Sequence, residues 1–220
     1  MVFDYVVRVM SVVLLAAMAA PSANADCALP AQVRIVTVNF SPGIAKDSFA
    51  SQPLVMYRAG PQRLRLEEAP DPANGIHQLI VTNWPDSWVV NLLDKTGQHA
   101  KDDDMVPVVH APVITADPSL GVPAAWDKLE YGCESQFFAE NKAGQVPTEK
   151  HDLVKHSLVE GAWRLTMVTA RDSPRPSMMI LSKDGKVIWA IRYTAYVQQG
   201  TAEPALFAKP EGITFSEPLE

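Results

Sequence analysis

Apolar and polar residues alternate along much of the first half of the chain, and this pattern predicts short antiparallel β-strands. Residues 32–40 are rich in β-branched side chains and place Val36, Val38 and Phe40 on one face. Turn-forming residues separate this strand from four more, predicted at residues 53–58, 63–68, 76–83 and 87–94. Two of these strands have one apolar face each, formed by Leu64 and Leu66 and by Trp88, Val90 and Leu92. Short strands with turns between them are typical of an antiparallel meander.

Three further strands are predicted in the last third of the chain. Residues 161–171 place Trp163, Leu165 and Met167 on one face. The adjacent residues Asp184 and Gly185 lie between two apolar runs, and Asp-Gly is a strong signal for a tight hairpin turn. On the second arm of this hairpin, alternation assigns one apolar face to Val187, Trp189, Ile191, Tyr193 and Ala195. The tail predicts a short apolar anchor at residues 206–207 and an edge strand near residues 213–215.

The middle of the chain is different, and residues 123–144 predict helix. Pro123 suits a first helical turn and Gly144 suits a stop. Gly132 lies inside this stretch and leaves open two short helices in place of one. The apolar positions of the segment are Trp126, Leu129, Tyr131, Cys133, Phe137 and Phe138. The stretch at residues 149–160 predicts an ordinary polar connection, and the charged run at residues 101–104 predicts a solvated loop.

The first residues predict export. An apolar run of about a dozen residues, too short to span a bilayer, is followed by Pro21 and by small residues at Ala23 and Ala25. This is the pattern of a secretory signal peptide. The prediction is a cleaved signal at residues 1–25 and a single periplasmic domain at residues 26–220, without stable membrane insertion. The alternative is an uncut N-terminal anchor.

Composition narrows the class of partner. The formal net charge is −6 with no basic run, which argues against nucleic acid and anionic membrane surfaces. The chain contains two cysteines, and Cys27 and Cys133 would both remain after cleavage. An even count in an exported protein predicts one disulfide between them.

Several stretches together resemble the periplasmic lipoprotein-carrier superfamily, which includes the outer-membrane lipoprotein-sorting proteins of LolA/LolB type. The resemblance rests on strand order, on the Asp-Gly hairpin, and on the closing phrase "LFAKPEGITF". It covers roughly residues 53–215. It implies an α+β fold in which a curved, mostly antiparallel sheet forms an incomplete barrel and a helical segment covers its concave apolar face. Between them, the family has a cavity that holds acyl chains. Family carriers usually open with an amphipathic helix, whereas this chain enters with a predicted strand.

On this interpretation the apolar face of the C-terminal strands lines the cavity, and the helical segment closes it. The predicted ligand-binding residues are Trp126, Trp163, Leu165, Met167, Met178 (or its neighbour Met179), Trp189, Ile191 and Tyr193. Methionine adapts to varied apolar shapes, and tryptophan and tyrosine offer large apolar area with a polar tip. The same residues could equally form a filled core.

Two functions follow. The first is a soluble exported carrier for a hydrophobic small molecule, a lipid or a lipidated protein. The alternative is a non-enzymatic cell-envelope interaction protein with a filled core and an envelope protein as its partner. We expect no enzyme, cofactor or metal site, because no nucleophile motif is found and the spacing of His151 and His156 suits neither a helix face nor a strand face.

Overall fold

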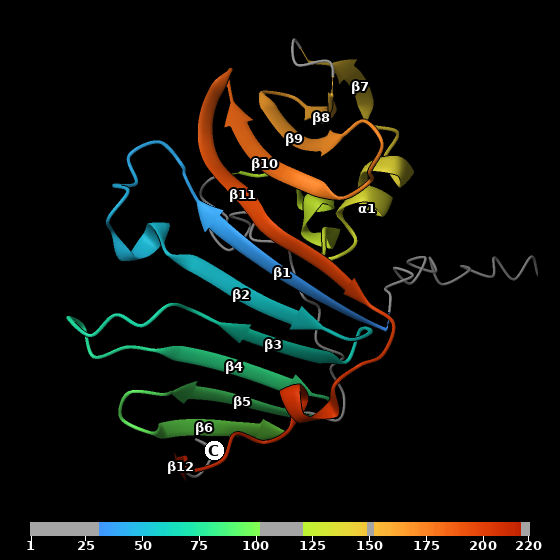
Figure 1. The fold of residues 1–220 in the computed structure, drawn as a ribbon. Coiled ribbons are helices and arrows are strands. Elements are labelled where there is room, and N and C mark those ends of the chain that lie inside the picture. Colours follow the sequence, from blue (N-terminus) through green and yellow to red (C-terminus); the bar gives the residue numbers. More distant parts are fainter. Residues whose placement is uncertain (1–30, 102–120, 149–151, 217–220) are drawn as a thin grey trace, which may run out of the picture.

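The computed structural model describes residues 31–101, 121–148 and 152–216. The predicted signal peptide and Cys27 lie outside these residues. Strands dominate the described chain and form one open, curved sheet (Figure 1). Their bounds are β1 (Gln32–Asn39), β2 (Pro53–Arg58), β3 (Arg63–Glu67), β4 (Gln78–Asn83), β5 (Asp86–Asn91), β6 (Thr96–Lys101), β7 (Gly144–Pro147), β8 (Leu153–Glu160), β9 (Trp163–Ala170), β10 (Pro176–Lys183), β11 (Lys186–Gln199) and β12 (Thr214–Ser216).

The sheet follows a simple topology. Its strand order is β12-β6-β5-β4-β3-β2-β1-β11-β10-β9-β8-β7. Neighbouring strands are antiparallel except β12 and β6, which are parallel. The N-terminal meander and the C-terminal meander are joined where β1 pairs with β11. The predicted curved, mostly antiparallel sheet is therefore confirmed.

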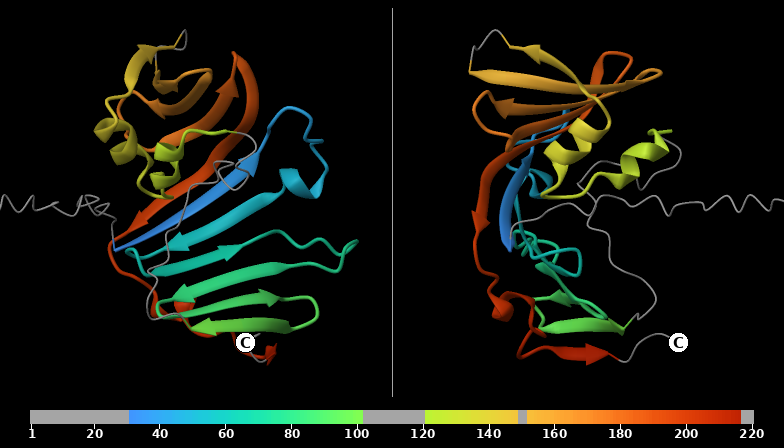
Figure 2. Two further views of the ribbon diagram at one scale, coloured as in Figure 1. Left: turned by 180° about the vertical axis from the view of Figure 1, so that it is seen from behind. Right: turned by 90° about the vertical axis from the view of Figure 1, so that its right-hand side faces the viewer.

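The helical elements are short. They are α1 (Glu134–Glu140) and the 3-10 turns η1 (Phe49–Ser51), η3 (Ala124–Lys128) and η4 (Pro204–Phe207). Gly132 lies between η3 and α1 and has a φ of 86°. Glycine suits this position because L side chains rarely adopt such a left-handed conformation. The alternative of two short helices is thus the correct one. Figure 2 shows η3 and α1 on the same side of the sheet. Within the described residues, no helix has the length and apolar character needed to cross a membrane.

The long strand β11 departs from simple alternation at two bulges. At the first bulge, Leu181 of β10 pairs with Trp189, whereas the next residue, Ser182, pairs with Val187, so one residue of β11 between them has no partner. A bulge changes the face of every residue beyond it, so Val187 leaves the face of Trp189 and is 40% exposed. The prediction for Val187 was therefore wrong. A second shift, beside Val36 of β1, brings Tyr196 in place of Ala195 onto the face of Tyr193, and the two tyrosine ring centroids are 6.3 Å apart.

Three strands were not predicted. They are β6, β7 and β8, and the stretch now assigned to β8 was predicted to be a polar connection. In β8 only Leu158 is buried, so the strand lacks the apolar face by which sequence patterns reveal strands. Hydrogen-bonded neighbours on both sides hold it in the sheet.

Two hydrophobic clusters lie on opposite faces of the sheet. The larger one, the main cluster, includes Val33 and Ile35 of β1. The second cluster consists of Leu79, Val81, Trp88 and Val90, with Leu92, Ile213 and Phe215 packed against it. Directly paired residues share a face, and Val81 pairs with Arg65 of β3. The next residue of β3, Leu66, points to the other face and packs against the main cluster. In β1 the main cluster contains Val33 and Ile35, whereas Phe40, predicted to lie on an apolar face, is 39% exposed.

Candidate ligand-binding site

Most of the predicted lining residues do come together. Seven of the eight belong to the main hydrophobic cluster: Trp126, Trp163, Leu165, Met167, Trp189, Ile191 and Tyr193. Each of the seven is at most 8% exposed. The eighth, Met178, is half-buried and lies outside the cluster. Its place is taken by Met179, the alternative, which pairs with Met167 and Ile191.

Residues of η3 and α1 pack into the same cluster. Trp126 comes from η3, Leu129 follows it, and Phe137 and Phe138 come from α1. The two phenyl rings meet edge to face with centroids 6.0 Å apart, which is a favourable aromatic geometry. Side chains of the helical segment and of the sheet therefore belong to one buried cluster.

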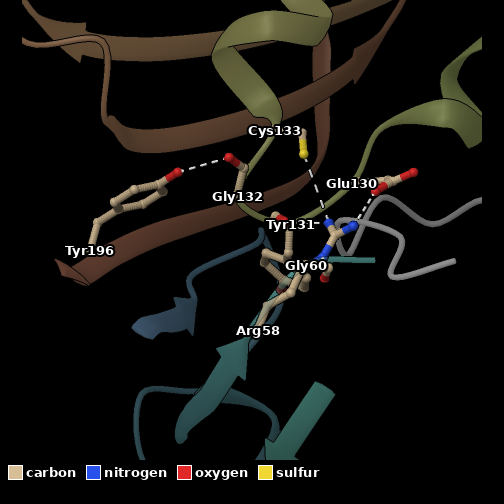
Figure 3. Close-up of polar contacts among 7 residues, drawn as sticks. All are labelled: Arg58, Gly60, Glu130, Tyr131, Gly132, Cys133 and Tyr196. Atoms are coloured by element: carbon tan, nitrogen blue, oxygen red, sulfur yellow. Dashed lines mark hydrogen bonds and ion pairs between the residues drawn. The ribbon is translucent and has the colours of Figure 1, made fainter. Parts of the chain in front are cut away.

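A buried arginine holds the segment that leads into α1 (Figure 3). Arg58, at the end of β2, is 2% exposed and donates through Nη1 to the backbone carbonyl of Tyr131 at 2.7 Å. Its Nη2 forms an ion pair with Glu130 at 2.5 Å. The guanidinium also lies 3.8 Å from the sulfur of Cys133. Arg58 therefore ties the η3–α1 connection to the sheet through charge-assisted hydrogen bonds.

A buried carboxyl group ties the first residue of α1 to β11. Glu134 is fully buried, and the Tyr193 hydroxyl donates to its Oε1 at 2.8 Å. Its Oε2 is buried without a hydrogen-bond partner. Desolvation raises the pKa of Glu134 to about 7, against the lowering effects of hydrogen bonds and of Arg58. Tyr196, further along β11, donates to the carbonyl of Gly132 at 3.1 Å.

These polar groups were not identified from the sequence. Arg58 and Glu130 are 72 positions apart, and Glu134 and Tyr193 are 59 apart. Such pairs form only once the fold brings distant segments together, so no local spacing in the sequence predicts them. The sequence holds one signal of such a buried polar group: a charged residue, Glu134, stands among apolar residues, between Cys133 and Phe137.

A pocket of about 690 Å³ lies between α1 and the β7–β9 end of the sheet. We refer to it as the α1 pocket. Buried Met167 and Phe138 contribute apolar surface to it. Its other lining residues are Ser135, Ala139, Lys142, Ala143, Gln145, Val154, His156, Thr169, Ala170, Arg171, Asp172, Ser173 and Pro174. A smaller pocket of about 180 Å³, beside η1, is lined in part by Trp189 and Ile191.

The described residues hold no group of three or more potential metal ligands. Of the two histidines considered from sequence, His151 lies outside the described residues. His156 is half-buried on β8, and its Nε2 is 3.1 Å from the Thr169 hydroxyl. The disulfide stays a prediction, because Cys27 also lies outside the described residues, while Cys133 is buried at the start of α1.

Comparison with known proteins gives a similarity to solved structures alone. No family model matches the chain, and no curated protein matches it. Among solved structures, it is similar to an uncharacterized conserved protein from Thermus thermophilus. The match covers 86% of this chain and 92% of that chain, with 11% sequence identity and a TM-score of 0.47. A similarity of this size carries no functional argument, so the resemblance to lipoprotein carriers stays a prediction.

Proposed function

We propose that the protein is an exported, non-enzymatic carrier that binds an acyl chain, as a free lipid or attached to a protein, in the α1 pocket. The observation that carries the proposal is the pocket of about 690 Å³ bordered by Met167 and Phe138. Pockets that bind small molecules typically measure about 300–1,000 Å³. Burial of an acyl chain contributes about 0.8 kcal/mol per CH₂ group, so binding needs few polar contacts.

In this proposal η3 and α1 form the cover of the apolar face. Their aromatic side chains fill its centre, and the ligand occupies the remaining space between α1 and β7–β9. The predicted signal peptide and the resemblance to lipoprotein carriers support a periplasmic location. The proposed site therefore lies at the edge of the apolar face and not in its middle. Of the lining residues expected from the sequence, Met167 borders the pocket.

The alternative is an interaction protein, and one observation favours it. The cluster around Trp189 is tightly buried, as a filled core would be. In that case the edge strand β7, on which Val146 is 59% exposed, is the element most suited to pairing with a strand of an envelope protein.

A bulky side chain at the pocket wall distinguishes the two functions. Ala139 is exposed on α1 and lines the α1 pocket. We expect Ala139→Trp to reduce binding of a fluorescent fatty acid by about tenfold or more, because the indole occupies the volume that the acyl chain needs. Titration by fluorescence would measure the dissociation constant of each variant.

The matched control is Ala125→Trp, an exposed alanine on η3 that does not line the pocket. It should bind the fatty acid as the unaltered protein does. If both variants bind equally well, the α1 pocket is not the ligand site. If the unaltered protein binds no fatty acid, the interaction-protein alternative is favoured.

A further inference from the structure

The α1 pocket has charged residues on two sides. Lys142 comes from the end of α1, and Arg171 and Asp172 come from the turn after β9. All three are exposed, so they lie at the rim of the pocket, whereas Met167 and Phe138 are at most 2% exposed and form its floor. Two apolar side chains on the inner side of the pocket and charged side chains at its rim correspond to the two ends of an amphiphile.

The two rim cations have no ion-pair partner within the described residues. The ion pairs found there involve Arg58, Arg65, His77 and His99, not Lys142 or Arg171. Asp172 is the single carboxylate among the lining residues. Partial burial lowers the pKa of His156, the remaining ionisable group, so its ring is neutral at pH 7. The rim consequently carries one net positive charge, although the whole chain is acidic.

The backbone places Lys142 at the rim in an unusual way. Lys142 has a φ of 53° in the turn that ends α1, where the amide of Ala143 donates to the carbonyl of Phe138 at 3.0 Å. Glycine or asparagine usually occupies this left-handed position, and other residues there are strained. The turn therefore places Lys142 at the end of α1, where it lines the pocket.

We propose that the α1 pocket selects anionic amphiphiles, with the acyl chain on the floor formed by Met167 and Phe138 and the anionic headgroup at the rim beside Lys142 and Arg171. This inference rests on the proposed carrier function and names the ligand class of the same site. A free fatty acid is the simplest ligand of this class, because its carboxylate is ionised at neutral pH. A neutral ester with the same acyl chain would contact Met167 and Phe138 on the floor but would form no ion pair with Lys142 or Arg171 at the rim.

The test compares cis-parinaric acid with its methyl ester, which share one fluorescent chain and differ in charge. For the unaltered protein at about pH 7.5 and low salt, we expect the acid to bind about tenfold more tightly, equivalent to about 1.4 kcal/mol. The double variant Lys142→Gln, Arg171→Gln should bind the two probes equally. Raising the salt concentration should also reduce the preference of the unaltered protein, because exposed charges are screened.

The control is the double variant Lys155→Gln, Arg164→Gln. Both residues are exposed on β8 and β9 but do not line the pocket, so the net charge changes by the same amount while the preference should persist. Equal binding of acid and ester by the unaltered protein would overturn the anionic selectivity and leave the carrier function standing. Failure to bind either probe would overturn both. Loss of the preference in the control variant as well would assign it to net charge and overturn the role of the rim.

Discussion

Replacing Arg58 by alanine is expected to lower the free energy of unfolding by about 3 kcal/mol. Removing one partner of a buried, hydrogen-bonded ion pair typically costs about 3–5 kcal/mol, because the remaining polar groups lose their partner. The lower end of this range applies here, since Glu130 is 28% exposed and water can solvate it. The backbone carbonyl of Tyr131 would also lose its 2.7 Å hydrogen bond. Urea denaturation followed by tryptophan fluorescence would measure the change.

Arg65→Ala is the matched control for this measurement. Arg65 forms an ion pair with Glu67 at 2.9 Å, with side chains 24% and 33% exposed. Exposed pairs contribute about 0–1 kcal/mol, so this variant should remain close to the unaltered protein in stability. Equal losses for Arg58→Ala and Arg65→Ala would contradict the assignment of Arg58 as the residue that secures the η3–α1 connection.

Glu134→Gln is expected to remove a pH dependence of stability. The folded protein raises the pKa of Glu134 from 4.5 to about 7, so it holds this proton more tightly than the unfolded chain. The contribution of this group to stability is therefore fully present below about pH 4.5 and is lost as the pH rises through about 7, since ionisation leaves a buried negative charge. At about 1.4 kcal/mol per pKa unit, the loss is about 3 kcal/mol.

Glutamine resembles the protonated carboxyl group and still accepts the Tyr193 hydrogen bond. The variant should match the unaltered protein near pH 4.5 and exceed its free energy of unfolding by about 3 kcal/mol at about pH 8.5. Denaturation curves at about pH 4.5, 7 and 8.5 would show this. Glu140→Gln, on an exposed residue of the same helix, serves as the control and should follow the unaltered protein at every pH. A constant offset between Glu134→Gln and the unaltered protein would refute the account.

Alternation and turn chemistry were sufficient to predict most of the sheet. In strands such as β9, apolar residues repeat at every second position, and this periodicity can be recognised in the local sequence. The hairpin turn was predictable for the same reason, and Asp184 and Gly185 both adopt positive φ, at 50° and 76°. Where alternation is broken, prediction failed. The bulges in β11 displaced Val187 and Ala195 from their predicted face, because a bulge is set by pairing with distant strands.

The candidate site was predictable only in its apolar part. Met167, which lines the α1 pocket, could be placed on the same face as Trp163 and Leu165 of the main cluster because their spacing in β9 is local. Selecting Met179 over Met178 required the register between β9 and β10. The cationic rim was beyond reach, because Lys142 and Arg171 line one pocket only after β7, β8 and β9 pair beside α1. The predicted strands did not include β7 or β8, so no pocket could be inferred there.

The central claim is that the protein carries an acyl ligand in the α1 pocket. Native mass spectrometry of the exported protein, purified without detergent and followed by solvent extraction, tests this most directly. The account predicts a bound species at near-stoichiometric amount that is lost in Ala139→Trp and retained in Ala125→Trp. A ligand-free mass for the unaltered protein, with no uptake of added fatty acid, would contradict the carrier function.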